Sequence, residues 1–314
     1  MNIEEVLSRI RPRRKITGIA AALLPFEDNG TVAVEAFQQH LLRTHAAGLI
    51  NAVNMDTGYV NYLSEDEQQQ ILKWTREALP ANTKFFAGAY IERLEGDVVA
   101  LYRRKIDQII ARGGTPIIFQ TARLQGQPAK GKIKCYQEIC RGFPEVLGFE
   151  LASVFANNGE IFDDETMRGL IEIPELVGLK HSSLDRMKEL ERLILRDRIR
   201  PEFRIYTGND RAIDMIEYGS DYLLGLATFA PEKFAERDHF WETGNPIYYE
   251  LSDALQHLGN LAFRSPIRAY KHSAAIFLKL TGRIPSDKTH ERSPNRPAWE
   301  TELMRECAER LKLG

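Results

Sequence analysis

The residue with the clearest chemical potential in this sequence is Lys180, which directly follows the apolar run Leu176–Leu179. A lysine at the end of a buried strand loses part of the solvation of its ammonium, so its pKa falls. The neutral amine is a nucleophile that can condense with a substrate carbonyl, and the resulting iminium draws electrons from a neighbouring bond. The alternative is a surface lysine at a strand end, with His181–Ser183 capping the next helix. Position alone leaves the two interpretations balanced.

A repeated unit gives Lys180 its place in the chain. Short apolar runs alternate with amphipathic helical stretches, mostly about 30 residues apart, as successive βα units require. Two helical stretches, Glu35–Ala47 and Glu65–Ala78, have apolar residues at spacings of three and four. Ser64 and Glu67 match a capping box at the start of the second. The eight expected strands are Ile16–Leu24, Leu49–Met55, Lys84–Tyr90, Pro116–Gln120, Val146–Leu151, Leu176–Lys180, Arg204–Thr207 and Tyr222–Ala227.

Eight βα units in a row form either a closed barrel or a doubly wound open sheet. A nucleotide-binding open sheet usually has a glycine-rich loop after its first strand, whereas Leu24–Phe26 stands at this position. The sequence therefore predicts an α/β fold, a (β/α)8 TIM barrel, over residues 16–244. We expect residues 1–15 to be an N-terminal arm, solvated or in a subunit contact. We expect residues 245–314 to be a C-terminal helical extension of the same domain.

In a (β/α)8 barrel the active site lies at the carboxyl ends of the strands, so the residues that end each run are candidates. Lys180 ends the sixth run. The second run is followed by Asp56, Thr57 and Gly58, and the fourth ends in Gln120. Other strand-end candidates are Phe149 in the fifth run, Gly208 after the seventh and Ala227 in the eighth.

Several stretches resemble the dihydrodipicolinate synthase and N-acetylneuraminate lyase superfamily of Schiff-base aldolases. The resemblance implies that Lys180 is the imine-forming nucleophile and that Thr57 and Gly58 hold a substrate carboxylate or carbonyl oxygen. It also implies substrate contacts from Phe149, Gln120, Asn157, Gly208 and Ala227. The stretches are Gly18–Phe26, Leu63–Glu67, Val177–Ser183, Thr207–Asp210 and Lys271–Gly282.

The chain departs from that superfamily at the residues that relay protons. The second-strand motif of the superfamily is usually Gly-Thr-Thr-Gly-Glu, and here Asp56 replaces a threonine. The fifth strand of the superfamily usually carries the tyrosine that shuttles a proton, and Phe149, which cannot transfer one, stands there. Gln120 occupies the place of a tyrosine pair on the fourth strand, and Asn157 lies near the place of an arginine after the fifth.

Two carboxylates, Asp56 and Glu150, could take over proton transfer beside the iminium. Neighbouring residues of a strand point in opposite directions. If Phe149 faces the barrel interior, Glu150 faces the helices and should pair with a cation there. We therefore favour Asp56, while both carboxylates could instead only bind substrate hydroxyls or a neighbouring subunit. An anion at Asp56 would repel a bare substrate carboxylate by a few kcal/mol at about 4 Å.

Composition narrows the class of protein. Lys and Arg total 42 and Asp and Glu total 44, which gives a net charge of -2. A chain so close to neutral has no electrostatic field that would attract nucleic acid or an anionic membrane. No apolar run is long enough to span a bilayer. Histidines and carboxylates lack metal-ligand spacing, so we expect no metal and no organic cofactor. Three cysteines, Cys135, Cys140 and Cys307, form no CxxC pair and predict free thiols in the cytoplasm.

The sequence as a whole predicts a cytoplasmic Schiff-base lyase with Lys180 and Asp56 as its catalytic residues. It would be an aldolase or dehydratase acting on a 2-oxo acid or a hydroxylated sugar acid. The missing tyrosine and arginine argue against dihydrodipicolinate synthase itself. The alternative is a barrel that binds a small carbonyl metabolite without turning it over. The resemblance also implies a homo-oligomer, a tetramer.

Overall fold

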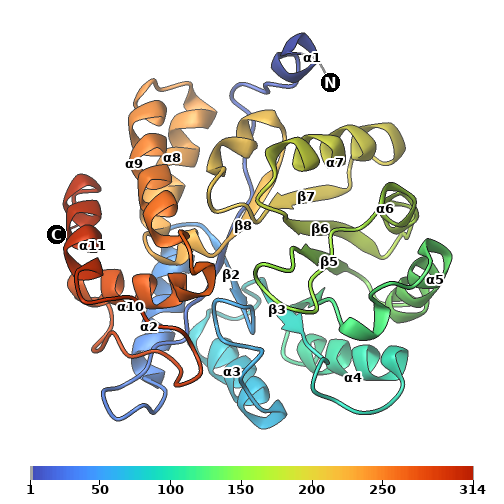
Figure 1. The fold of residues 1–314 in the computed structure, drawn as a ribbon, viewed down its shortest axis with the longest axis horizontal. Coiled ribbons are helices and arrows are strands. Elements are labelled where there is room, and N and C mark those ends of the chain that lie inside the picture. The colour runs from blue at the N-terminus through green and yellow to red at the C-terminus, as the bar shows by residue number, and fades with distance from the viewer. Residues whose placement is uncertain (1–2, 314) are drawn as a thin grey trace.

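A computed structural model describes residues 3–313 and shows a closed barrel of eight parallel strands (Figure 1). The strands follow one another around the barrel in chain order, and the last pairs with the first. The predicted (β/α)8 fold is therefore confirmed, and each of the eight predicted runs overlaps a strand. The strands are β1 (Gly18–Ala21), β2 (Ile50–Val53), β3 (Phe85–Ala89), β4 (Thr115–Ile118), β5 (Val146–Leu151), β6 (Leu176–Ser182), β7 (Arg204–Thr207) and β8 (Asp221–Leu224).

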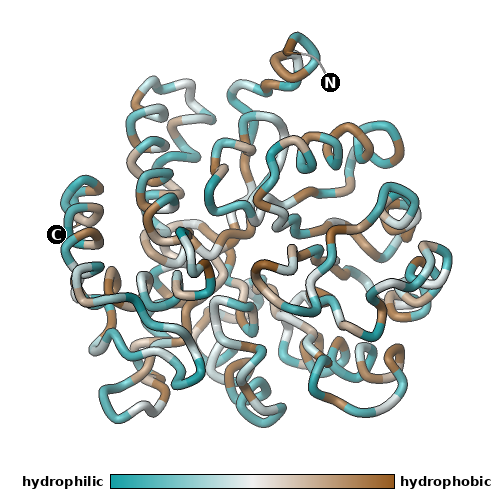
Figure 2. The backbone as a smooth tube through the Cα atoms, in the orientation of Figure 1, coloured by the Kyte–Doolittle hydropathy of each residue, from teal (hydrophilic) through white to brown (hydrophobic). Residues whose placement is uncertain are grey.

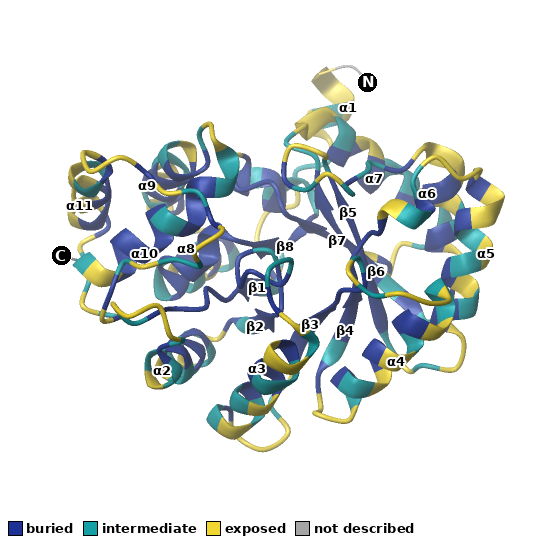
Figure 3. Cartoon of the chain, turned by 60° about the horizontal axis from the view of Figure 1, so that its bottom comes forward, coloured by how far each residue is buried: buried dark blue, intermediate teal, exposed yellow. Residues whose placement is uncertain are grey.

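Helices surround the barrel and leave the strands buried at its centre, as the dark blue core of Figure 3 shows. The predicted capping box at Ser64 and Glu67 is present, with both of its hydrogen bonds formed. Short 3-10 helices, η1 (Ala122–Leu124), η2 (Ile213–Tyr218), η3 (Leu226–Thr228) and η4 (Ile267–Ala269), lie in the connections. The α-helices that follow β1 to β6 in turn are α2 (Val34–Ala46), α3 (Glu65–Ala78), α4 (Val98–Ile110), α5 (Ala129–Cys140), α6 (Asp164–Ile171) and α7 (Arg186–Ile199). After β7 the chain forms only η2, and α8 (Pro231–Thr243) follows β8.

Both faces of the barrel wall are buried, which is why the strands read as continuous apolar runs. Within β1, Ile19 and Ala21 belong to the cluster that fills the barrel, whereas Ala20 belongs to the cluster beneath the helices. In β5, Leu147 and Phe149 likewise face inwards. Figure 2 shows the same division, with hydrophobic strands at the centre and hydrophilic outer faces on the helices.

The N-terminal arm and the C-terminal extension both contact the barrel. In the arm, which includes α1 (Ile3–Leu7), Arg9 pairs with Asp197 of α7 and Arg14 with Asp221 of β8. Part of the basic run is therefore held by its own chain. The extension consists of α9 (Ile247–Ala262), α10 (Tyr270–Leu280) and α11 (Glu300–Arg310). Figure 1 shows α10 running from the middle of the molecule towards its edge, where α11 lies.

Glu150 faces away from the barrel interior, as the alternation of β5 predicts. Its carboxylate accepts hydrogen bonds from Arg192 Nε at 2.9 Å and pairs with His181 Nδ1 at 2.6 Å, and all three side chains are fully buried. Burial disfavours its charged form, but His181 and Arg192 together outweigh this effect and lower the pKa of Glu150 to about 2. Glu150 is thus a structural ion-pair partner between β5 and α7.

Replacing Arg192 by methionine should lower the free energy of unfolding by about 3–5 kcal/mol. The buried carboxylate of Glu150 then keeps only His181 as an ion-pair partner. The measurement is urea unfolding followed by circular dichroism at pH 7. The matched control is Arg186→Met on the same helix, whose pair with Asp214 is partly exposed and should contribute no more than about 1 kcal/mol. Equal losses in the two variants would contradict the structural role of Glu150.

The same network predicts how stability depends on pH. A carboxyl whose folded pKa lies below its unfolded pKa of about 4.3 stabilises the protein above that pH. The contribution of Glu150 is therefore present above about pH 4.3 and is lost as the pH falls towards about 2.

Candidate active site

Lys180 lies in β6, two residues before the strand ends, and projects into the barrel mouth. Its side chain is 7% exposed, and its Nζ lies 4.6 Å from the centroid of the Phe149 ring on the neighbouring strand. Gly208 makes room for it, because a Cβ at position 208 would lie 2.6 Å from Lys180 Cε. Two of the predicted site residues, Phe149 and Gly208, therefore contact the predicted nucleophile directly.

The electrostatics of the mouth lower the pKa of Lys180. Burial removes water from its ammonium and lowers the pKa, while the carboxylates of Asp210 and Asp56 oppose this shift. Burial also raises the pKa of Asp210 to about 7, against the opposing charge of Lys180. A lysine with a lowered pKa beside a carboxyl with a raised pKa is a pair of groups that could serve imine chemistry.

A buried acid, Glu189 of α7, holds the turn that carries Asp210. Its carboxylate accepts hydrogen bonds from Thr207 Oγ1 at 2.9 Å, Asn209 Nδ2 at 2.6 Å and Ser220 Oγ at 2.6 Å. Asp210 itself accepts from the backbone N–H of Leu226 at 2.7 Å. Both ends of the turn are fixed, so the Asp210 carboxyl has a defined position beside Lys180.

Asp56 lies at the rim of the mouth and is bound by two residues of the C-terminal extension. Its carboxylate pairs with Lys271 Nζ at 3.1 Å and accepts a hydrogen bond from Tyr270 Oη at 3.1 Å. The Lys271 ammonium is itself buried. The repulsion that an isolated anion at Asp56 would exert on a substrate carboxylate is therefore offset by a cation from the same chain.

Thr57 and Gly58 form the turn after β2. Thr57 Oγ1 is hydrogen bonded to Tyr270 Oη at 2.9 Å, and the Gly58 N–H donates to the carbonyl of Met55. The backbone is left-handed at Asn54 and Tyr59, with φ of 51° and 60°. Such a conformation is costly for residues other than glycine and is concentrated at functional sites.

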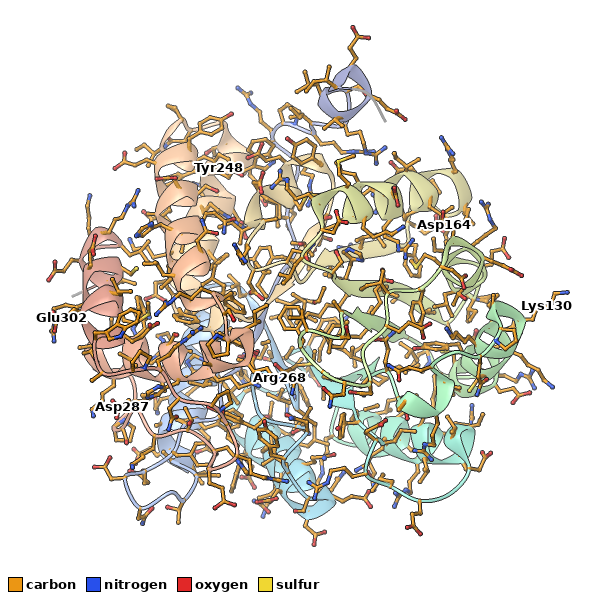
Figure 4. The ribbon with its side chains drawn as sticks, in the orientation of Figure 1. Lys130, Asp164, Tyr248, Arg268, Asp287 and Glu302 are labelled. Atoms are coloured by element: carbon orange, nitrogen blue, oxygen red, sulfur yellow. The ribbon has the colours of Figure 1, made fainter. Side chains whose placement is uncertain are left out.

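The remaining predicted contact residues lie at the mouth but have structural partners. The Gln120 side chain accepts from the N–H groups of Leu151 and Glu160, which fixes the loop after β5. Asn157 in this loop is exposed, and its Oδ1 accepts from Arg268 at 3.0 Å. Figure 4 labels Arg268, which reaches the loop from the extension. Ala227 is fully buried in η3.

Sequence reasoning missed Asp210, Tyr270 and Lys271 as members of the site. Asp210 had a usable signal, since it ends the turn after the seventh predicted strand. Tyr270 and Lys271 lie at the start of α10, and the signal there was a lysine in a helix whose other residues are largely apolar. Ser182, two residues after Lys180, has a buried Oγ without a hydrogen-bond partner in residues 3–313.

A small cavity lies at the rim of the mouth and has Asp56, Gln120 and Asn158 among its lining residues. It has a volume of about 20 Å3, which is room for about one water molecule. A wider groove of about 940 Å3 lies between the loop after β1 and the loop before α11. Lys180 and Asp210 line neither of these two cavities.

No protein-family model matches the chain, but individual proteins do. The chain is 24% identical to 4-hydroxy-tetrahydrodipicolinate synthase of Nostoc punctiforme over 216 residues, which cover 67% of this chain and 69% of the relative. It is 25% identical to the enzyme of the same name from Parasynechococcus marenigrum over 244 residues, 76% of this chain and 77% of the relative.

Solved structures share the fold. Dihydrodipicolinate synthase from Thermotoga maritima superimposes with a TM-score of 0.82 at 17% sequence identity. The superposition covers 96% of this chain and 100% of the synthase chain. A second structure is that of YagE from E. coli K12, a prophage protein belonging to the dihydrodipicolinic acid synthase family, in complex with pyruvate. It superimposes with a TM-score of 0.81 at 12% sequence identity, and the superposition covers 95% of this chain and 99% of the YagE chain.

The solved structures show that the chain shares the fold of the dihydrodipicolinate synthases. The sequence relatives support a divergent relationship to the same enzymes, and the kind of function that this relationship supports is that of a lyase.

Asp210→Asn should move the pH midpoint of Lys180 reactivity to lower pH. The Asp210 carboxylate opposes the lowering of the Lys180 pKa, so its removal lets that pKa fall further, while asparagine keeps an acceptor for the Leu226 N–H. The measurement is the pH dependence of borohydride trapping with pyruvate. Asp214→Asn, at a partly exposed position, is the control and should leave the midpoint in place. A midpoint that stays fixed or rises in Asp210→Asn would contradict the coupling.

Proposed function

We propose that the protein is a Schiff-base-forming lyase, an aldolase or dehydratase that acts on a 2-oxo acid or a hydroxylated sugar acid. The observation that carries this proposal is the buried Lys180 with its lowered pKa, facing Asp210, whose pKa is about 7. The relationship to the dihydrodipicolinate synthases supports the same chemistry. We further propose that the reaction differs from that of dihydrodipicolinate synthase, since Phe149 stands where that enzyme class usually has its proton-shuttling tyrosine.

In the proposed reaction Lys180 attacks the substrate carbonyl as a neutral amine. Asp210 in its carboxylate form takes the ammonium proton beforehand, and in its carboxyl form it returns a proton to the carbinolamine hydroxyl, which leaves as water. The product is an iminium with Phe149 beneath it, whose ring face favours a nearby cation. The iminium then accepts the electron pair of the bond that breaks.

The residues proposed to hold the substrate surround Lys180. Thr57 and Gly58 would bind a carboxylate or carbonyl oxygen, with Asp56 as acid, base or hydroxyl ligand at the rim. Ser182 Oγ, buried and without a partner in the described chain, is available to a substrate oxygen. Further contacts are proposed from Phe149, Gln120, Asn157, Gly208 and Ala227. No metal or organic cofactor enters the proposed reaction.

A screen of 2-oxo acids with borohydride, read by mass spectrometry of the intact chain, tests the proposal. The wild type should gain the mass of the reduced adduct, and Lys180→Ala should not. Lys271→Met should still gain it, because Lys271 is ion-paired to Asp56. An adduct that survives Lys180→Ala would move the nucleophile elsewhere. An adduct without turnover of any 2-oxo acid or sugar acid would favour the alternative, a barrel that binds a carbonyl metabolite.

We also propose a homotetramer in the cytoplasm. The superfamily resemblance supports association, and the cysteines Cys135, Cys140 and Cys307 are all free thiols, which suits a reducing compartment. Light scattering at micromolar concentration is expected to give about four times the 35.9 kDa chain mass. A monomer mass under these conditions would remove the oligomer from the proposal.

A further inference from the structure

Tyr270 occupies a position in the mouth that the mechanism above does not use. It begins α10, its side chain is 3% exposed, and its ring stacks on Phe263 with centroids 4.3 Å apart. Its hydroxyl lies between Thr57 Oγ1 at 2.9 Å and Asp56 Oδ2 at 3.1 Å. Asp56, Tyr270 and Thr57 therefore form a continuous chain of hydrogen bonds from the rim of the mouth towards its interior.

The inner end of this hydrogen-bonded chain packs against Gly225, close to the groups that act on Lys180. A Cβ at Gly225 would lie 3.3 Å from Thr57 Oγ1 and 3.2 Å from a ring carbon of Tyr270. The backbone of Gly225 in turn hydrogen bonds to Asp210, whose charge interacts with that of Lys180. The opposite end, Asp56, has a side chain 18% exposed. One end of the chain thus meets solvent and the other lies in the buried mouth.

The direction of each hydrogen bond follows from proton counting. A tyrosine hydroxyl has one proton, and Tyr270 donates it to Asp56. Thr57 must then donate its own proton to Tyr270 Oη, which leaves the lone pairs of Thr57 Oγ1 free to accept a proton. Burial raises the pKa of Tyr270 well above its usual value, so the phenol stays neutral. Lys271 compensates the charge of Asp56 at the outer end.

We propose that Asp56, Tyr270 and Thr57 form a proton relay that carries protons from the substrate iminium to solvent, with Tyr270 of the C-terminal extension as its central member. The inference rests on the proposed function and specifies how that site removes a proton. It assigns a part in the reaction to α10, which lies outside the barrel strands.

The proposed step, written for pyruvate, is balanced. A proton leaves the methyl carbon of the Lys180 iminium and bonds to Thr57 Oγ1. The hydroxyl proton of Thr57 moves to Tyr270 Oη, and that of Tyr270 moves to Asp56, which becomes neutral. The electron pair of the broken C–H bond forms the carbon–carbon double bond of the enamine, and the π pair of the C=N bond moves onto the nitrogen, which becomes neutral. Asp56 then exchanges its proton with water.

Deuterium uptake at the pyruvate methyl group in D2O, followed by proton NMR, measures this step without knowledge of the natural substrate. Tyr270→Phe keeps the stack on Phe263 but lacks the hydroxyl, and exchange should fall by about 10²-fold or more. Borohydride trapping of the pyruvate adduct on Lys180 should remain at the wild-type level. Asp56→Asn should show a similar loss, and the double variant should be no slower than the slower single variant, because the residues act in series.

Tyr248→Phe is the matched control, since Tyr248 lies on α9 of the same extension, donates to Glu217 and lies away from Arg268 in Figure 4. It should leave exchange unchanged. Exchange within a few fold of wild type in Tyr270→Phe would overturn the relay, as would loss of the adduct together with exchange, which indicates a structural role. A wild type that forms the adduct without exchange would also overturn it. A wild type without any adduct would instead remove the proposed function.

Discussion

The site depends on the cost of placing the ammonium of Lys180 where water cannot solvate it. The side chain ends in a barrel mouth filled by Phe149 and covered at β7 by Gly208, and this burial lowers its pKa. A buried lysine without compensation would simply stay neutral. The negative charges of Asp210 and Asp56 oppose the lowering of the Lys180 pKa and so favour the charged ammonium. These opposing effects act on the proton affinity of the amine, which the proposed imine chemistry would use.

The carboxylates that balance Lys180 are themselves balanced by residues from other parts of the fold. Asp210 shares the buried mouth and has a pKa of about 7, whereas Asp56 pairs with Lys271 of the extension. Asp210 is held by the turn that Glu189 anchors from α7. Strand β6 and the turns after β2 and β7 thus carry Lys180, Asp56 and Asp210. Helices α7 and α10 supply the groups that bind the Asp210 turn and Asp56.

The sequence allowed the fold and the buried position of Lys180 to be predicted because both depend on local patterns. Eight apolar runs separated by amphipathic helices define the barrel, and the alternation along β5 correctly placed Phe149 inside and Glu150 outside. Tyr270 and Lys271 could not be predicted in the same way. Their place at the mouth depends on how α10 packs across the barrel, more than 200 residues from Asp56 in sequence, and no local period records such a contact.

The inward-facing residues around β5 give a physical reason why the proposed proton relay lies between β2 and α10 and not at β5. Phe149 packs edge-to-face on Phe119 with ring centroids 5.0 Å apart, and Phe119 packs in the same way on Tyr90. At β5, beneath Lys180, this layer offers the ring face of Phe149 to the proposed iminium but no hydroxyl. A polar relay in the same layer would need hydrogen-bond partners there, since an unpaired buried hydroxyl is costly. At β2 those partners exist, because Thr57 and Asp56 already face the extension, and Tyr270 joins them. In this chain, an apolar fifth strand and a polar contact between β2 and α10 are therefore two parts of one arrangement.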